Sequence, residues 1–565
     1  MFEGKKHLFL IIVLCVLSLF TLMIGNDGVS LTHPDEVFYN QTAKEMIAHR
    51  SWLTPYLFGQ PQFEKPILTY WLLIVAIKIF GLTAFAARFM PSLFGILGVL
   101  LTYWVAFLMF RKKTAAFLSA VVLSTSFIWV ALSRSVLTDM IFSVLVTLSI
   151  AFFYYAYTNT KRKTLGLILF FATSGLAVLA KGVLGFIFPA GIMICYLIYH
   201  RDLKFLRSYA TLAGFLLFLL IAIPWHWLMV QQFGKSFIEE YWQNVHVRRI
   251  FQAEHQKSNT WYFYLLTMFA GVFPWSLFLV PAGFLLNRVL RKEKELRPHF
   301  VFLFIWIGWV FFLMQIAQSK LSSYIFPFFP ALAILLGFYF DRIFMSKPSL
   351  LSGDDREKVF HFIFSLMSGI ALLVGCAVAL YFVPKYGPAF HAVKAGCIFI
   401  GLLFICAVSV LIFTFKKDFV KSFWATSSLI GILLASLSFS YAAAEPWVSC
   451  KQICDVFKKI DPSQDVILTS KFYARGVHYY TDRPVAVIDI NGSGFFSPHP
   501  IAFLSTDEQV IEFLKQRPVT YCIVKKNQWE SLKRITQDKF NIIFFQEIGG
   551  KYILSIEQFK QASLK

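Results

Sequence analysis

The chain has few charged residues for its length. Only 15% of its 565 residues are charged, whereas 58% are hydrophobic, and the mean hydropathy is +0.64. Soluble domains contain about 25% charged and about 45–50% apolar residues. An apolar excess of this size cannot be buried in a water-soluble core, and it also excludes a disordered or collagen-like chain. The composition therefore predicts a membrane protein that crosses the bilayer many times.

Cysteine is sparse as well. The eight cysteines are scattered, mostly in apolar runs where they are typical small core residues, and no pair has the spacing of a zinc site. This excludes a disulfide-rich scaffold. Cys450 and Cys454 lie four residues apart, so one helical face could hold both, but this spacing is poor for a disulfide within a regular helix. The sequence leaves open whether either is bonded.

Acidic residues are outnumbered by basic ones. There are 31 Asp and Glu against 53 Lys and Arg, which gives a formal net charge of +22. In a soluble protein this charge would suggest nucleic acid. In a membrane protein, Lys and Arg instead accumulate in cytoplasmic loops beside anionic lipid. We therefore expect membrane lipids and no nucleic acid as partners, with an anionic substrate such as a phosphate as the other source of the bias.

No small-x-small cleavage motif follows the first apolar run. This run, residues 7–24, comes after two lysines as a signal peptide would, but only Gly25-Asn26-Asp27-Gly28 follows it. We therefore predict a retained helix with a cytoplasmic N-terminus. By the positive-inside rule, residues 26–65 are then expected on the outer side of the membrane.

The segment 66–80 is shorter than the roughly 20 residues that a membrane-spanning helix needs. If it crossed, the basic cluster Arg111-Lys112-Lys113 after the next apolar run would lie outside, against the positive-inside rule. We therefore predict an interfacial helix here, which also accommodates Lys78 better than the bilayer centre would.

If residues 66–80 do not cross, the charges of the remaining loops agree with the positive-inside rule for thirteen crossings and a C-terminus on the outer side. The predicted crossings are 7–24, 89–110, 114–132, 139–157, 164–180, 182–200, 208–229, 262–287, 300–317, 324–340, 359–383, 394–415 and 422–442.

The composition changes at Ala444. Residues 1–443 form the predicted transmembrane part, and residues 444–565 have ordinary hydropathy. Alternating elements in this second part predict a small α/β domain outside the membrane, without a catalytic motif. The expected strands are 466–468, 485–488, 521–524 and 552–555, and the expected helices are 507–515 and 528–534.

Ionisable residues gather in the predicted outer loops. Asp35 and Glu36 follow the first crossing in Leu31-Thr32-His33-Pro34-Asp35-Glu36. An ionisable residue in or beside the membrane is costly, so a functional site is the default expectation. Helix capping and interfacial snorkelling are the alternatives for Arg134 and Lys320, and an N-cap is the alternative for Asp35.

A second polar block lies at the head of the predicted interfacial helix. It reads Gly59-Gln60-Pro61-Gln62-Phe63-Glu64-Lys65-Pro66 and continues into Tyr70-Trp71. The acid–base pair Glu64-Lys65 would lie near the lipid headgroups, where an ammonium group can bind a lipid phosphate. We therefore predict that Lys65 contributes to a phosphate site.

These blocks resemble the membrane glycosyltransferases of the ArnT and protein O-mannosyltransferase superfamily. The Phe-Glu-Lys-Pro block and the overall length are most similar to the aminoarabinose transferases that modify lipid A. The motifs occur in order along roughly residues 1–340: Asp35-Glu36, Phe63-Glu64-Lys65-Pro66-x-x-x-Tyr70-Trp71, Ala87-Arg88-Phe89-Met90-Pro91, Ser133-Arg134-x-x-x-x-Asp139-Met140, Ala180-Lys181-Gly182 and Ser319-Lys320-x-x-x-Tyr324-x-x-Pro327.

The resemblance implies a polytopic α-helical GT-C fold in the bacterial inner membrane, with a periplasmic α/β domain at the C-terminus. It implies transfer of a sugar, 4-amino-4-deoxy-L-arabinose, from polyprenyl (undecaprenyl) phosphate to lipid A or another periplasmic acceptor, with no nucleotide cofactor. The outer loops 26–88 and 231–260 would carry the site. Asp35 would be the catalytic carboxylate, with Glu36 beside it and Asp139 in the same site. The residues expected to bind the donor and its phosphate are Lys65, Arg134, Lys181, Arg248, Arg249, Lys320 and Tyr324.

The resemblance also implies zinc or another divalent cation. In the aminoarabinose transferases, the glutamate that matches Glu64 helps to hold zinc with a histidine from a later outer loop. Here the candidate is His246, in Asn244-Val245-His246-Val247-Arg248-Arg249, with His33 and His255 as alternatives. A stable zinc site usually has three or four protein ligands, so the metal has less support than the phosphate site.

The chemistry of glycosyl transfer agrees with these residue types. A carboxylate must accept the proton of the acceptor, and positive charge must stabilise the departing phosphate. Phosphate is a good leaving group, so no paired general acid is needed. One carboxylate on the far face of the sugar then gives inversion, as in inverting glycosidases.

Other functions stay open at this point. Mannosyl or other hexosyl transfer to protein or another glycan would use the same fold, because the sequence does not identify the sugar. A transporter is disfavoured because there is no inverted repeat and the ionisable residues cluster on one face. A structural membrane subunit would leave the Asp35 and Lys65 blocks unexplained.

Overall fold

The computed structural model describes residues 2–253, 258–345, 356–387, 392–490, 492, 494–495, 499–537 and 539–559. The chain divides into two compact units, each assembled from separate parts of the sequence. The membrane unit consists of Met1–Asn26, Lys65–Thr69 and Arg88–Ser440. The α/β unit consists of Asp27–Glu64, Tyr70–Ala87 and Tyr441–Lys565.

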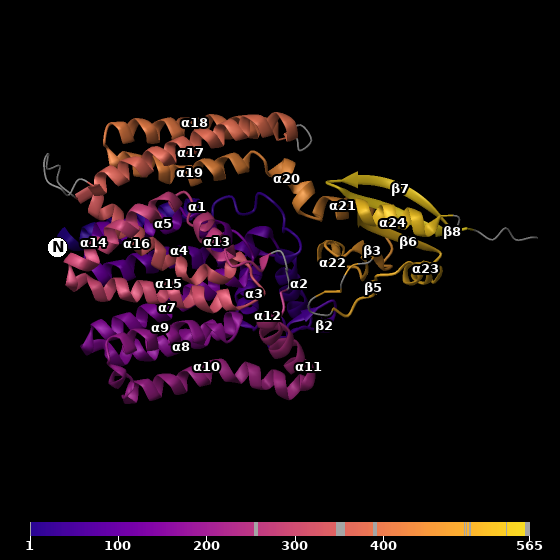
Figure 1. Cartoon of the computed structure of the whole chain (residues 1–565). Helices are drawn as coiled ribbons and strands as arrows, with labels where there is room; N and C mark the ends of the chain where they lie inside the picture. The colour runs from indigo at the N-terminus through magenta and orange to yellow at the C-terminus, as the bar shows by residue number, and fades with distance from the viewer. Residues whose placement is uncertain are drawn as a thin grey trace, which may run out of the picture. The chain divides into compact units, whose positions relative to one another are not determined.

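The membrane unit is built from long apolar helices (Figure 1). In the described part of the chain, ten helical segments are long and apolar enough to cross a membrane, or up to twelve if each of two bent pairs forms one span. The ten comprise α1 (Phe2–Leu22), α4 (Ala84–Phe110), α7 (Thr138–Thr158), α8 (Lys163–Lys181), α10 (Tyr209–Phe233), α15 (Arg297–Ile316), α16 (Phe329–Met345), α17 (Arg356–Tyr386), α18 (Val393–Phe415) and α19 (Phe419–Ser438).

Two helix pairs are bent, and hydroxyl side chains lie at the break of the first pair. Helices α5 (Lys113–Ser124) and α6 (Phe127–Ser133) meet at 63°. At this break the Thr125 and Ser126 hydroxyls donate back to the carbonyls of the preceding turn, at 2.7 Å each, a pattern that bends helices. Helix α13 (Phe263–Gly271) and the helical segment Ser276–Lys292, which includes α14 (Leu279–Lys292), meet at 112°.

Eleven of the thirteen predicted crossings fall on single helical segments, and the other two, 114–132 and 262–287, fall on the two bent pairs. The predicted crossing 182–200 corresponds to α9 (Leu184–Tyr199), which is apolar but shorter than the other segments. The helical membrane architecture is therefore confirmed, and the number of true crossings stays a prediction.

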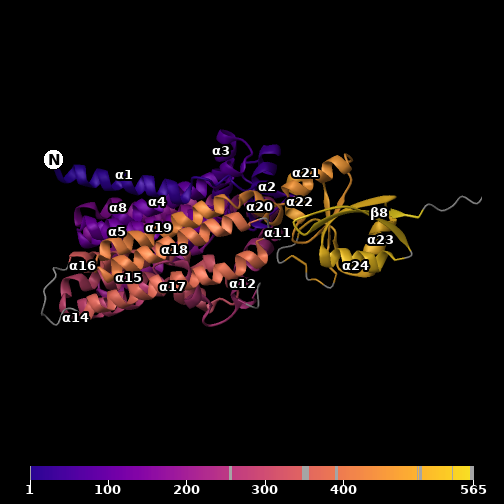
Figure 2. The same ribbon diagram turned by 90° about the horizontal axis from the view of Figure 1, so that it is seen from above.

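Small and polar side chains bring these helices together. Ser149 of α7 donates to the carbonyl of Phe170 in α8 at 2.9 Å and lies 2.7 Å from the Ser174 hydroxyl. Gly337 of α16 faces Ser119 of α5, where a β-carbon would stand 2.4 Å from the Ser119 nitrogen. Small residues allow such close backbone approach in membrane helices. Helices α17, α18 and α19 lie side by side (Figures 1 and 2).

The α/β unit contains a six-stranded mixed sheet in the order β5-β4-β3-β6-β8-β7. Strands β5, β4, β3 and β6 are parallel, and β8 pairs antiparallel with β6 and β7. The strands are β3 (Ile467–Ser470), β4 (Val485–Ile488), β5 (Phe503–Leu504), β6 (Val519–Lys525), β7 (Phe540–Ile548) and β8 (Lys551–Gln558). The four predicted strands are all present, and β5 and β7 are additional.

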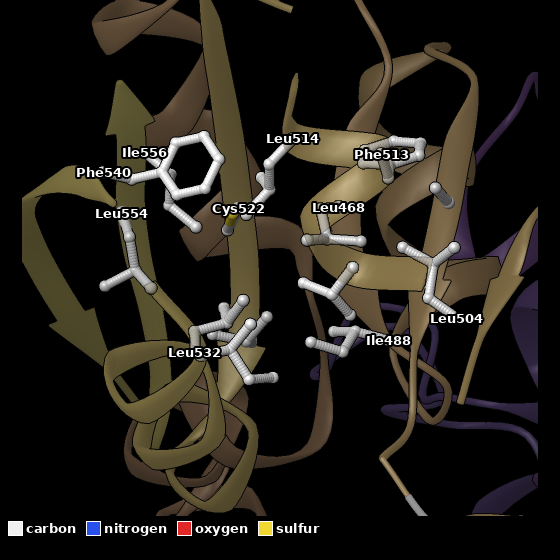
Figure 3. Close-up of a cluster of buried hydrophobic side chains, with 14 of the residues drawn as sticks. Leu468, Ile488, Leu504, Phe513, Leu514, Cys522, Leu532, Phe540, Leu554 and Ile556 are labelled. Atoms are coloured by element: carbon white, nitrogen blue, oxygen red, sulfur yellow. The ribbon is translucent and has the colours of Figure 1, made fainter. Parts of the chain in front are cut away.

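Alternating side chains build a hydrophobic core on each face of this sheet. Leu468 and Cys522 point to one face, which α23 (Asp507–Lys515) and α24 (Lys526–Thr536) cover (Figure 3). Ile467 and Ile523 point to the other face, which α21 (Lys451–Ile460) and α22 (Ala474–Thr481) cover. This period of two is the signature of strands buried on both faces. The predicted α/β domain is confirmed.

The cysteines of this domain are not bonded to each other. All eight cysteines of the chain are free thiols. Cys450 precedes α21 and Cys454 lies in it, and both are fully buried in the second core. Burial raises the pKa of Cys450 to about 12, so both behave as small apolar residues.

The remainder of the α/β unit comes from the N-terminal part of the chain. It contains α2 (Asp35–Ala48), a hairpin of β1 (Tyr56–Leu57) and β2 (Gln60–Pro61), and the part of α3 (Leu68–Phe80) from Tyr70 onward. Helix α3 has 13 residues, about 20 Å at 1.5 Å per residue, which is short of the roughly 30 Å hydrocarbon core. This length is consistent with the predicted interfacial helix, and its membrane position stays a prediction.

Candidate active site

In the membrane unit, Asp139 and Lys181 form a buried ion pair. Asp139 lies in the first turn of α7 and Lys181 in the last turn of α8, so each charge is favourable for its helix dipole. Their side chains are 9% and 12% exposed, and Lys181 Nζ lies 2.5 Å from Asp139 Oδ1. Two motifs that are separate in the sequence thus meet where α7 begins and α8 ends.

Tyr324 and Arg249 extend this pair into a cluster. The Lys181 ammonium lies 5.0 Å from the centre of the Tyr324 ring. The Arg249 guanidinium donates to the Tyr324 hydroxyl at 3.4 Å, and the Arg249 carbonyl accepts from the Ser319 amide at 3.1 Å. The predicted residues Asp139, Lys181, Arg249 and Tyr324 therefore come together, and we call them the cation cluster.

Lys320 is a second buried cation, beside Ser319. It is only 4% exposed, and its ammonium donates to the Asn259 side-chain oxygen at 2.8 Å. Burial lowers the pKa of this lysine. Burial of an ammonium group costs free energy, and a neutral amide oxygen offsets less of this cost than a negative charge does. The Lys320 site is therefore suited to an anionic ligand.

The segment that carries Lys65 also approaches the end of α8. Lys65 is half-buried. Four residues later, the Thr69 hydroxyl donates to the carbonyl of Ala180 at 3.4 Å, next to Lys181. The structure thus brings the Lys65 segment to the helix end that carries the cation cluster.

Two other predicted donor ligands have different local contacts. Arg134 donates to the carbonyls of Thr21 at 3.3 Å and Ile24 at 2.9 Å, at the end of α1. Cations commonly satisfy carbonyls at a helix C-terminus in this way, so this contact favours the structural alternative for Arg134. Arg248 donates to the Gln252 side chain at 2.8 Å on an exposed turn.

In the α/β unit, the adjacent acids Asp35 and Glu36 have opposite environments. The Asp35 side chain is 65% exposed. Glu36 is 5% exposed, and its carboxylate accepts from the Thr32 amide and hydroxyl, both at 2.9 Å. Helix α2 begins at Asp35, and Pro34 occupies the N-cap position without a side-chain cap. Asp35 is therefore not the N-cap residue, and Glu36 stabilises the turn before the helix.

Arg475 of α22 faces both predicted acids of this unit, and the sequence did not point to it. Its guanidinium lies 4.0 Å from Asp35 Oδ1 and 3.7 Å from Glu64 Oε1. It also donates to His499 Nε2 at 2.9 Å. Burial and the Arg475 charge lower the pKa of His499 to about 4, so this histidine is a neutral acceptor. No motif marks Arg475, because only packing brings it to residues from the start of the chain.

Glu45 fixes the hairpin that leads to Glu64. Phe58 and Gly59 form its turn with positive φ values of 55° and 73°, and their amides donate to the Glu45 carboxylate at 3.0 and 2.9 Å. His478 of α22 lies 3.2 Å from the same carboxylate. Burial alone would raise the pKa of Glu45, but the hydrogen bonds from His478, Gly59 and Gln41 lower it.

Two of the predicted metal ligands, Glu64 and His33, lie in the described part of the chain. Among the described residues no group of three or more His, Cys, Asp or Glu side chains could hold a metal ion. The His246 side chain and His255 lie outside the described residues. His33 lies 3.7 Å from the Cys450 sulfur, and burial together with Lys551 and Lys525 lowers its pKa to about 3. Because the described residues do not form a set of three ligands, we derive no step through a metal.

Known proteins resemble this chain in sequence and fold. Residues 8–241 match the family model for dolichyl-phosphate-mannose-protein mannosyltransferase. An uncharacterized protein of Aquifex aeolicus is 28% identical over 84% of this chain and 87% of its own length. The undecaprenyl phosphate-alpha-4-amino-4-deoxy-L-arabinose arabinosyl transferase 2 of Proteus mirabilis is 29% identical over 58% of this chain, and the match spans 59% of that enzyme.

The same fold occurs in a solved structure. The crystal structure of ArnT from Cupriavidus metallidurans bound to undecaprenyl phosphate superposes with a TM-score of 0.75 over 97% of both chains, at 19% identity. The chain therefore has the fold of this ArnT structure, and part of its sequence is similar to the mannosyltransferase family model and to the arabinosyl transferases. The resemblance to the ArnT and protein O-mannosyltransferase group that the sequence motifs indicated is confirmed.

Proposed function

We propose that the chain transfers 4-amino-4-deoxy-L-arabinose from undecaprenyl phosphate to lipid A, on the periplasmic side of the bacterial inner membrane. The names of the arabinosyl transferase relatives support this sugar and donor. The observation that carries the proposal is the cation cluster with the neighbouring buried Lys320, since the buried ammonium groups of Lys181 and Lys320 and the half-buried guanidinium of Arg249 are suited to a phosphate.

In the proposed reaction, an oxygen of the acceptor attacks the anomeric carbon of the sugar. The bond from this carbon to the phosphate oxygen breaks, and the phosphate leaves with the electron pair. Asp35 accepts the acceptor's proton, and Lys181, Arg249 and Lys320 stabilise the charge on the leaving phosphate. Attack from the face opposite the phosphate inverts the configuration.

A second candidate is transfer of mannose or another hexose from a polyprenyl phosphate to protein or another glycan. The match of residues 8–241 to the mannosyltransferase family model supports it. Both candidates need the same acid and the same phosphate site, so they differ only in the sugar and the acceptor.

Mass spectrometry of lipid A distinguishes the two candidates. We expect a pentosamine mass increment in cells that express the chain and none in cells that lack it. The Asp35→Asn variant should abolish the increment, whereas Asp455→Asn, at an exposed carboxylate of α21, should retain it. An unmodified lipid A together with chain-dependent hexosylation of protein or glycan would establish the second candidate instead.

Donor binding can be tested separately with two cations. Lys65 lies in the segment that reaches the end of α8, whereas Arg50 is exposed in the turn after α2. Loss of a charge-assisted hydrogen bond costs about 1.5–3 kcal/mol, so Lys65→Ala should weaken apparent donor affinity roughly tenfold to a hundredfold. Arg50→Ala should have little effect. Equal effects of the two changes would contradict a phosphate site at Lys65.

A further inference from the structure

One guanidinium of the C-terminal domain faces two acids from the N-terminal part of the chain. Arg475 lies in the first turn of α22, within the α/β unit. Its Nη1 and Nη2 atoms lie 4.0 Å from Asp35 and 3.7 Å from Glu64. These are ion-pair distances and are longer than hydrogen bonds. Arg475 can therefore hold both carboxylates by charge without a hydrogen bond to either.

The position of Arg475 is fixed before any ligand binds. Its side chain is 14% exposed, and the guanidinium carbon lies 4.6 Å from the centre of the Phe38 ring in α2. His499 accepts a hydrogen bond from Nη2 at 2.9 Å. A planar guanidinium held by a ring and a hydrogen bond loses little freedom when it orients a carboxylate. The side chain is thus suited to set the direction and charge of its neighbours.

Helix α22 itself is tied to the N-terminal part of the unit. One turn after Arg475, His478 lies 3.2 Å from the Glu45 carboxylate. Tyr480 donates to the carbonyl of Leu31 at 3.3 Å, four residues before Asp35. Both contacts come from residues that follow Arg475 on the same helix, so the helix that carries it is anchored to α2 and to the turn that precedes α2.

We propose that Arg475 is a positioning residue for the transfer reaction, which rests on the proposed function. It orients Asp35 so that the carboxylate can accept the acceptor's proton, and it balances the charge of Glu64. Through α22, the C-terminal part of the chain then contributes to the site at Asp35 within the α/β unit. On this view the domain is required for catalysis, in addition to any role in binding an acceptor.

Kinetics of the purified full-length chain, with a polyprenyl phosphate sugar as donor, test this role. Arg475→Gln should lower kcat roughly tenfold to a hundredfold, because misplacing a catalytic group by about 1 Å can cost about 10²-fold in rate, with little change in the donor KM. Arg475→Lys keeps the charge and should recover part of the rate. The matched control is Arg534→Gln, which removes an exposed guanidinium that pairs with Asp507 at 3.0 Å in the same unit.

The split between kcat and the donor KM separates positioning from a merely structural role. A residue that only maintains the fold would affect both constants, whereas loss of positioning lowers kcat alone. Arg475→Gln should therefore lower kcat with the donor KM near its wild-type value, and Arg475→Lys should recover part of kcat. A kcat within threefold of wild type, or an equal change in both constants, would overturn the proposal.

A stability measurement checks the contact independently of turnover. Arg475 and Glu64 are both 14% exposed, so Arg475→Gln and Glu64→Gln should lower the thermal midpoint non-additively in a double-mutant cycle. Additive shifts would overturn the assigned pairing. If the wild-type chain transfers no sugar from any polyprenyl phosphate, the proposed function fails, and this cycle still decides whether the pairing exists.

Discussion

Replacement of Asp35 by Asn should reduce turnover strongly and leave folding nearly unchanged. Asn keeps the shape of the side chain but cannot accept a proton. Loss of a general base lowers rates by roughly 10²–10⁴, or about 3–5 kcal/mol in the barrier. The Asp35 side chain is 65% exposed and 4.0 Å from Arg475, so its ion pair is worth about 0–1 kcal/mol. Its first-turn position in α2 adds about 0.3–1 kcal/mol.

The adjacent acid provides a matched control with the opposite pattern. Glu36 is buried and accepts two hydrogen bonds from Thr32. Glu36→Gln should therefore lower the free energy of unfolding by about 1–3 kcal/mol and affect turnover much less than Asp35→Asn does. Single-turnover kinetics and thermal denaturation of both variants measure the two effects. An Asp35→Asn enzyme that still transfers sugar at near the wild-type rate would refute the catalytic assignment.

Three further predictions follow from other contacts. Lys181→Met removes the partner of the buried Asp139 carboxylate and should lower the free energy of unfolding by about 3–5 kcal/mol. The double variant Lys181→Met/Asp139→Asn should recover most of the lost stability, as measured by thermal denaturation. Glu45 has a pKa lowered from its ordinary value of 4.5, so its contribution to stability is present above about pH 4.5 and is lost as pH falls through the lower folded value. The stability gap between wild type and Glu45→Gln should therefore narrow between pH 6 and pH 3.5, and a constant gap would contradict this. Cysteines at Gln60 and Ala84 should react with a membrane-impermeant thiol reagent from the same side, and labelling from opposite sides would show that α3 crosses the membrane.

Much of the helical architecture could be predicted because the bilayer imposes simple requirements on the sequence. A span needs about 20 apolar residues and must satisfy its own backbone hydrogen bonds. Hydropathy and the positions of Lys and Arg therefore located each helix from α1 to α19 that was expected to cross. The bends after Ser124 and Gly271 were not predicted, because hydropathy records how apolar a segment is and not where its axis changes direction.

The α/β domain was predicted in part, because only its buried strands are marked by apolar runs in the sequence. The central strands β3, β4, β6 and β8 are apolar runs buried on the sheet, so composition identifies them. Strand β5 has only two residues, and β7 is largely exposed at the edge of the sheet. Helix α22 has the sequence ARGVHYYT, without a clear apolar stripe, and was missed.

The sequence by itself determined the membrane class and the α/β domain, and it supplied the motif residues of the candidate site as a prediction, because hydropathy and short motifs are local properties. Only the tertiary structure showed that Asp35 is exposed and Glu36 is buried. Neighbouring residues of a helix point in different directions, so one side chain faces solvent and the other faces the core. Only the tertiary structure paired Asp139 with Lys181 and brought Arg475 to Asp35. Such contacts depend on helix ends and chain segments that meet through packing, and no local pattern in the sequence encodes that meeting.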